Sequence, residues 1–121
     1  MDPQNFKPDV LRDPPPGESE EIAELRRDVV GALRTVYDPE IPVNIYDLGL
    51  IYDVQISDNG EIRILMTLTS PNCPEAGILP RVVESKAAAV PGVSDCTVEL
   101  VWDPTWGMDM MSEAAKLQLN L

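Results

Sequence analysis

Two runs of alternating apolar and polar residues, joined by a tight-turn sequence, constrain the fold more than any other feature of this chain. The runs span residues 50–57 and 62–69, and Asp58-Asn59-Gly60 lies between them. Asn-Gly between alternating runs is a strong signal for a β-hairpin. In the second run the apolar side chains share one face, which predicts a sheet with one buried and one wetter face. These side chains are Ile62, Ile64, Met66 and Leu68.

A helix is expected ahead of this hairpin. Apolar residues recur at spacings of three and four between Ile22 and Val36, which is the pattern of one amphipathic helix. Ser19 precedes the pattern and is a favourable N-cap. Asp38-Pro39 should end the helix, because proline disfavours helical geometry in the residue before it.

After the hairpin the pattern predicts a helix over 78–90, a third strand over 95–102 and a short last helix over 112–119. Pro80 is unfavourable inside a helix, so the regular helix should start near Leu79. The third strand would place four side chains on its core face, including Trp102. The four are Cys96, Val98, Leu100 and Trp102.

The fold class that follows is α+β, in two layers, with helices packed on a small three-stranded sheet. The element order is helix, strand, strand, helix, strand, helix. A helix joins the second and third strands, so a right-handed crossover would leave them parallel and would allow the first strand to lie between them. Residues 1–18 are dense in proline and should form an extended, flexible tail, which leaves 19–121 as one domain.

Composition excludes several classes of function. The net charge is −12, which disfavours binding to nucleic acid and to anionic membranes. The chain has no histidine, the commonest metal ligand and general base. No apolar run reaches transmembrane length and the N-terminal residues lack a signal-peptide pattern, so we expect a cytoplasmic protein with reduced thiols.

Cys73 is the sharpest candidate for chemistry. It lies between Pro71 and Pro74, after a strand and before a helix, where backbone amides can stabilise a thiolate that binds iron or attacks an electrophile. The alternative is that Cys73 is a small buried apolar residue. Cys96 is expected to be such a core residue because it shares a face with apolar neighbours.

Other candidates carry two interpretations each. Asp38, Glu40 and Asp47 could bind a cation or act as acid and base, but the favoured interpretation is that the aspartates cap turns in a loop and Glu40 is solvated. Trp106, ahead of three methionines, could form an apolar contact surface or could fold back over the sheet.

No CxxC pair, glycine-rich phosphate loop or Ser/His/Asp set is present. Iron–sulfur clusters usually take four thiolate-type ligands, and one chain supplies at most two. A permanent cluster held by one chain is therefore disfavoured, whereas a transient or shared cluster is compatible with the sequence.

The chain resembles the SufT-like family of iron–sulfur assembly proteins in three long segments and, more briefly, at Pro91-Gly92-Val93, Trp106 and Met111-Ser112-Glu113-Ala114-Ala115. This family also includes the cytosolic iron–sulfur assembly component of eukaryotes, the PaaD proteins and the N-terminal part of some Mrp-type ATPases. The segments are Asp38-Pro39-Glu40-Ile41-Pro42-Val43-Asn44-Ile45-Tyr46-Asp47-Leu48-Gly49-Leu50-Ile51-Tyr52, then Met66-Thr67-Leu68-Thr69-Ser70-Pro71-Asn72-Cys73-Pro74, then Val98-Glu99-Leu100-Val101-Trp102-Asp103-Pro104. The likeness covers roughly residues 20 to 121.

The resemblance implies an α+β fold, a role in iron–sulfur protein maturation beside the SUF machinery, and a reactive cysteine at Cys73. It implies no catalysis and no permanent cofactor, only a transient iron or cluster at Cys73. The residues that would bind or shape the site are Asp38, Glu40, Asn44, Asp47, Thr69 and Trp106.

The partners implied are SUF assembly proteins and apo iron–sulfur proteins, and a homodimer could share a cluster through two copies of Cys73. Three alternatives stay open: an accessory subunit of a multicomponent oxygenase, as for PaaD, a metal-free adaptor, and an enzyme with Cys73 as nucleophile. The absence of a PaaD-type cysteine-rich tail disfavours the first.

Overall fold

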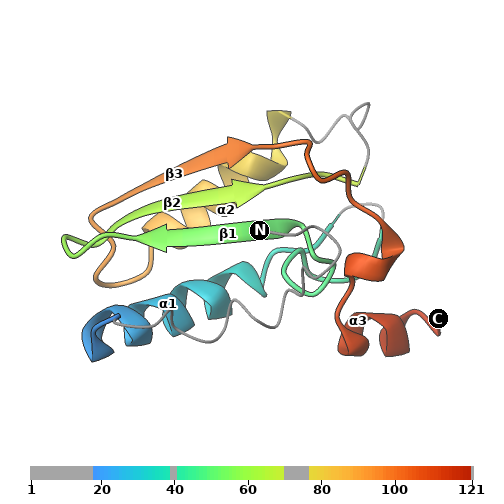
Figure 1. Ribbon diagram of the computed structural model, residues 1–121, viewed down its shortest axis with the longest axis horizontal. Coiled ribbons are helices and arrows are strands. Elements are labelled where there is room, and N and C mark those ends of the chain that lie inside the picture. The colour runs from blue at the N-terminus through green and yellow to red at the C-terminus, as the bar shows by residue number, and fades with distance from the viewer. Residues whose placement is uncertain (1–17, 39–40, 70–76, 121) are drawn as a thin grey trace.

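A computed structural model describes residues 18–38, 41–69 and 77–120 (Figure 1). The predicted α+β class and element order are confirmed, with one 3₁₀ turn added before the last helix. In chain order the elements are α1 (Glu20–Leu33), β1 (Ile51–Ile56), β2 (Glu61–Met66), α2 (Leu79–Ala88), β3 (Asp95–Leu100), the 3₁₀ turn η4 (Met108–Met110) and α3 (Glu113–Gln118). None of the helices in these described ranges has the length and apolarity that a membrane span requires.

The sheet has the order β1-β2-β3, with β1 antiparallel to β2 and β2 parallel to β3 (Figure 1). The predicted parallel pairing is confirmed. The expectation that the first strand could lie between the other two is wrong. The short Asp58-Asn59-Gly60 turn pairs β1 directly with β2 and leaves one free edge on each strand, and β3 occupies the free edge of β2.

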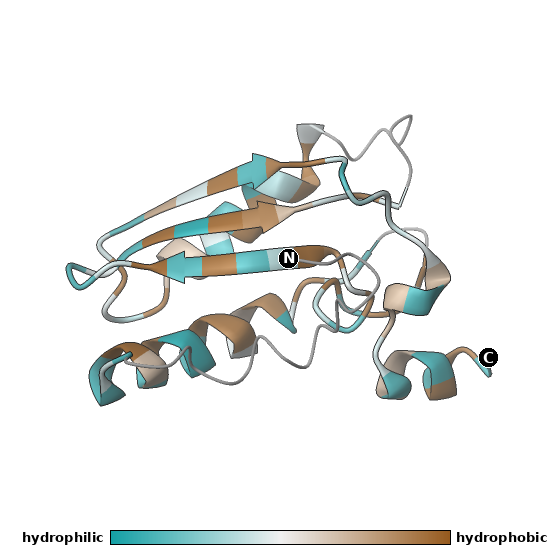
Figure 2. Ribbon diagram, viewed as in Figure 1, coloured by the Kyte–Doolittle hydropathy of each residue, from teal (hydrophilic) through white to brown (hydrophobic). Residues whose placement is uncertain are grey.

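One face of the sheet carries the main core. Residues of β1, β2 and β3 pack there against α1 and α2, which also contact each other. Apolar and polar residues alternate along the strands, as Figure 2 shows by colour. The predicted buried face of the second strand is confirmed, because Ile62, Ile64, Met66 and Leu68 are each at most 3% exposed.

The first helix begins as predicted but ends early. The Ser19 hydroxyl accepts a hydrogen bond from the Ile22 amide at 3.2 Å, which makes Ser19 the N-cap. The helix stops at Leu33 and not at Asp38. The carbonyl of Val36 instead accepts from the Ile45 amide at 2.8 Å, so the chain leaves the helix to pair with the following loop.

A buried arginine joins α1 to the sheet. Arg26 is 5% exposed and donates from Nη1 to the carbonyl of Val54 in β1 at 2.6 Å. Its other nitrogens donate to both carboxylate oxygens of Glu18, at 3.1 and 2.8 Å. A buried charge of this kind is stable only when its donors are paired, and here three of them are.

The later elements follow the prediction with one exception. The helix α2 starts at Leu79 with Pro80 in its first turn, where a missing amide proton costs little. Ser112 caps α3 by accepting from the Ala115 amide at 3.1 Å. Trp102 was expected in the core, but it is 43% exposed because β3 ends at Leu100 and the chain turns away from the core face.

Gly49 should be intolerant of substitution, whereas Gly31 should not. Gly49 has a φ of +85°, and a Cβ there would lie 2.3 Å from the carbonyl oxygen of Met110. Gly31 lies in α1 and has no atom within 4 Å of such a Cβ. We expect Gly49→Ala to lower the free energy of unfolding by about 2 kcal/mol or more, and Gly31→Ala to raise it by roughly 0.5–1 kcal/mol. Urea unfolding measures both, and equal effects would contradict this assignment.

Candidate functional site

Three segments that carry the sequence motifs meet at one end of the sheet. They are the loop 41–50, the residues after β2 and the residues after β3. The Thr67 amide donates to the Leu50 carbonyl at 2.8 Å, and the Val101 amide donates to the Met66 carbonyl at 2.8 Å. Because β2 and β3 are parallel, their carboxyl ends lie at this same end of the sheet, which is a usual position for binding sites (Figure 1).

Asp38 caps the turn that opens the loop. Its side chain is buried, and Oδ1 accepts from the Ile41 amide at 3.0 Å. Its own amide donates to the Val43 carbonyl at 3.2 Å. This geometry matches the favoured interpretation of Asp38 as a capping residue.

Asp47 holds the loop together through its side chain and its backbone. Asn44 Nδ2 donates to Asp47 Oδ2 at 2.8 Å, and the Asp47 amide donates back to Asn44 Oδ1 at 2.9 Å. Arg34, just after α1, donates to Asp47 Oδ1 at 3.1 Å, with its guanidinium carbon 5.4 Å from the centre of the Tyr46 ring. The Ser112 amide donates to the Asp47 carbonyl at 2.8 Å. Sequence reasoning found Asp47 and Asn44 but missed Arg34, because nothing in its local pattern marks its partner.

Tyr52 is a second residue that sequence reasoning did not single out. Its hydroxyl donates to the Pro104 carbonyl at 2.6 Å and lies 3.4 Å from Met110 Sδ. Burial raises the pKa of Tyr52 to about 12, with smaller contributions from Asp103 and Asp109, against a lowering contribution from the Thr67 hydroxyl. The phenol therefore stays protonated near neutral pH and acts as a hydrogen-bond donor between β1 and the segment after β3.

Trp106 folds back onto the loop of residues 41–50, which we call the motif loop. Its indole Nε1 donates to the Leu48 carbonyl at 2.7 Å, and the ring packs on the edge of the core. Met110 and Met111 are buried, whereas Met108 is 54% exposed. Of the two interpretations, folding back is confirmed for Trp106. Thr69, the last described residue before Cys73, is half-buried.

Cys73 and Glu40 lie outside the described residues. The described chain on either side of Cys73 nevertheless adjoins the motif loop. On one side Thr67 is hydrogen-bonded to Leu50, and on the other side Ile78 lines a hollow together with Tyr37, the neighbour of Asp38 in sequence.

Cys96 is a core residue, as expected. It is 4% exposed and faces the main core. Burial, with smaller contributions from the charges of Glu84 and Asp95, raises the pKa of Cys96 to about 11. A thiol of this kind is protonated at neutral pH, so it is a poor ligand and a poor nucleophile.

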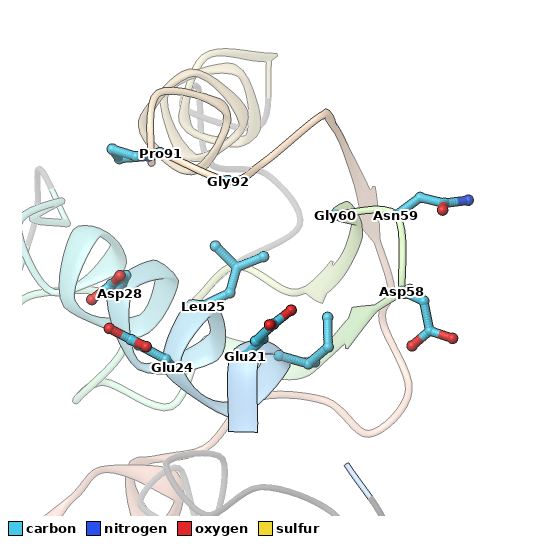
Figure 3. Close-up of a pocket in the computed structure, with 10 residues that line it drawn as sticks. Glu21, Glu24, Leu25, Asp28, Asp58, Asn59, Gly60, Pro91 and Gly92 are labelled. Atoms are coloured by element: carbon cyan, nitrogen blue, oxygen red, sulfur yellow. The ribbon is translucent and has the colours of Figure 1, made fainter. Parts of the chain in front are cut away.

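An acidic groove of about 390 Å³ lies at the opposite end of the sheet, beside the β1–β2 turn. Glu21, Glu24 and Asp28 of α1 line one side of it and Asp58 lies across from them (Figure 3). Within the ranges that the structure describes, no three His, Cys, Asp or Glu side chains are placed to hold a metal ion. The groove is therefore a solvated acidic surface of the helix and turn.

We expect Cys96 to be unreactive in the folded protein. In a Cys73→Ser variant it is the only thiol, and a pKa of about 11 against an ordinary 9.0 lowers the thiolate fraction at pH 8 by ~100-fold. Iodoacetamide should alkylate the folded variant at least that much more slowly than the same variant in guanidinium chloride. Equal rates would contradict the burial.

The raised pKa of Cys96 also makes the stability of the protein depend on pH. The folded state holds the thiol proton more tightly than the unfolded chain, so the contribution of Cys96 to stability is complete below pH 9 and is lost as the pH rises towards 11. A Cys96→Ala variant should lack that part of the alkaline decline.

Comparison with known proteins identifies the family. The family model described as iron-sulfur cluster assembly protein matches residues 26–100. An Fe-S protein maturation auxiliary factor of Porphyromonas gingivalis is 49% identical over 100 residues, which cover 83% of this chain and 95% of that protein. The Fe-S protein maturation auxiliary factor SufT of Staphylococcus aureus is 41% identical over 86 residues, with 71% of this chain and 98% of that protein covered.

The fold agrees with a solved structure. The crystal structure of a domain of unknown function, DUF59, from Bacillus anthracis superposes with a TM-score of 0.76 at 37% identity, covering 81% of this chain and 93% of that one. Sequence motifs, fold and relatives agree, and the chain belongs to the iron–sulfur cluster assembly protein family, among its SufT-like members.

Proposed function

We propose that this protein is an auxiliary factor in the maturation of iron–sulfur proteins. The observation that carries the proposal is that described residues of the three long motif segments meet at one end of the sheet, where Thr67 bonds to Leu50 and Val101 bonds to Met66. Relatives that match almost their whole length to this chain are named Fe-S protein maturation auxiliary factors, which supports the same role.

Cys73 would act as a transient ligand for iron or for a cluster. The chain has two cysteines, and Cys96 is buried with a raised pKa, so each copy offers at most one accessible thiolate. A cluster that needs four ligands must take the others from a second copy, a partner protein or a small thiol. Such incomplete ligation suits a protein that passes iron or a cluster on and does not retain it.

The neighbouring polar residues would shape this site without catalysing a reaction. Asp38 and Asp47 are engaged in holding the loop, and Asn44 is bonded to Asp47. The Tyr52 phenol is protonated near neutral pH, and the chain has no histidine to serve as a general base. Glu40 and Thr69 would complete the polar lining, and Trp106 would fix the loop behind it.

The partners in this proposal are SUF assembly proteins and apo iron–sulfur proteins in the cytoplasm. The rival functions are an accessory role for a single multicomponent oxygenase and a metal-free adaptor. Co-purification with oxygenase subunits, in the absence of assembly proteins, would favour the first rival.

Complementation tests the thiol mechanism. In a strain that lacks the gene and is grown under iron limitation, wild type should restore the activity of cytosolic [4Fe–4S] enzymes. The Cys73→Ala variant should lose most of this restoration, because no other accessible thiol can replace the ligand. Cys96→Ala is the matched control, and it should restore activity as far as its stability allows.

Two other outcomes would revise the proposal in different ways. Equal restoration by Cys73→Ala would show that the protein works through its surface as an adaptor. Wild-type enzyme activities in the strain without the gene would contradict a role in maturation.

A shared cluster predicts a change of oligomeric state. Reconstitution with ferrous iron and sulfide under anaerobic conditions should convert a monomer to a dimer on gel filtration with light scattering, with one cluster per dimer, and Cys73→Ser should stay monomeric. A loaded monomer would rule out sharing between two copies and would leave a partner or a small thiol as the source of the remaining ligands.

A further inference from the structure

An apolar groove runs along the outward side of α2, next to the candidate site. One hollow of about 430 Å³ lies between the chain after α1 and the first half of α2. A second hollow of about 380 Å³ shares Ile78, Val82 and Lys86 with the first. We call the two hollows together the α2 groove. Its remaining lining residues are Thr35, Val36, Tyr37, Gly77, Leu79, Arg81 and Ser85.

The floor of the α2 groove is unusually apolar for a solvent-facing surface. Tyr37, Ile78 and Val82 are 58%, 63% and 37% exposed, and they are three of the six large apolar residues that are exposed in the described chain. Exposed apolar side chains that occur singly are common. Here, however, three of the six lie together in one groove, which is typical of a contact surface.

The rim of the groove is basic, although the protein as a whole is strongly acidic. Arg81 and Lys86 line it, and none of the described residues that line it is an aspartate or glutamate. Neither of these two cations forms an ion pair with a described residue. By contrast, the other four described arginines are each paired with a carboxylate. Those four are Arg26, Arg27, Arg34 and Arg63.

We propose that the α2 groove binds a short helical segment of a partner protein, in which aliphatic side chains three and four residues apart are flanked by carboxylates. The apolar floor would take the aliphatic side chains, and Arg81 and Lys86 would pair with the acids at the rim. Ile78, Val82 and Lys86 follow one another at spacings of four, along about 12 Å of helix, which fits a segment of roughly two helical turns.

The inference rests on the proposed function, because it names a surface through which a maturation factor would hold a protein partner. A second copy of this chain is a poorer occupant. Each copy carries a net charge of −12, and the repulsion between two such chains opposes association.

Peptide binding to the full chain tests the proposal without iron or a cluster. The probe is a fluorescein-labelled peptide of about 14 residues with leucines spaced three and four apart and glutamates at the other positions. A second peptide carries lysine in place of each glutamate. Fluorescence anisotropy gives the affinities, and amide shifts in ¹⁵N-labelled protein locate the binding site.

We expect the glutamate peptide to bind with shifts at 35–37 and 77–86, and to bind at least tenfold more tightly than the lysine peptide at low salt. Val82→Ser and the double variant Arg81→Glu/Lys86→Glu should each weaken binding at least tenfold. Leu117→Ser and Lys116→Glu are the matched controls on α3, where Leu117 is 75% exposed, and both should bind as wild type does. Circular dichroism confirms that all variants are folded.

Equal binding of the two peptides, shifts elsewhere in the chain, or an equal loss in the α3 controls would overturn the proposal. Two results on the free protein would each indicate a different occupant of the α2 groove. Val82-dependent self-association in sedimentation velocity would indicate a second copy, and amide shifts within residues 2–17 on Val82→Ser would indicate the N-terminal segment of the chain. Because no metal is present in this experiment, its failure leaves the complementation test of Cys73 unaffected.

Discussion

The arrangement of the candidate site depends on one residue, Asp47. Its carboxylate joins Arg34, at the end of α1, to Asn44 within the motif loop. Its backbone carbonyl holds the start of α3 by accepting from the Ser112 amide. The bonds from Arg34 are charge-assisted and partly shielded from water, so they constrain geometry more than an exposed pair would. An aspartate in a family motif can therefore serve a binding site indirectly, by fixing the loop that forms its wall.

The site end of the sheet is a frame of hydrogen bonds between segments that are distant in the sequence. Hydrogen bonds from Thr67, Trp106 and Tyr52 connect the three segments that meet there. In the described chain, neither the thiol of Cys96 nor the phenol of Tyr52 is ionised near neutral pH. Under the proposed function the thiol chemistry falls to Cys73, the other cysteine of the chain. The α2 groove adjoins this frame at Tyr37 and Ile78, so a bound segment would lie beside the site.

Most of the fold could be predicted from local patterns, because local physics decides those elements. The Ser19 and Ser112 caps, the Asp58-Asn59-Gly60 turn and the start of α2 at Leu79 depend on residues a few positions apart. The errors arose where distant residues decide. α1 ends early because Val36 pairs with Ile45, Trp102 is exposed because β3 stops at Leu100, and β2 is central because the distant β3 pairs with its free edge and not with that of β1. The partners of Asp47 and Tyr52 were missed for the same reason, since Arg34 and Pro104 lie 13 and 52 positions away.

The buried arginine of α1 has a consequence for the behaviour of the protein in a crowded solution. A three-stranded sheet has two outer strands, and unpaired backbone groups on such strands can recruit strands from other molecules into aggregates. Arg26 occupies the carbonyl of Val54 on β1, and β3 carries the exposed acids Asp95 and Glu99. A side chain of the same molecule therefore occupies one carbonyl on one outer strand, and the other outer strand carries exposed charge. Both features disfavour the addition of strands from other molecules to this sheet.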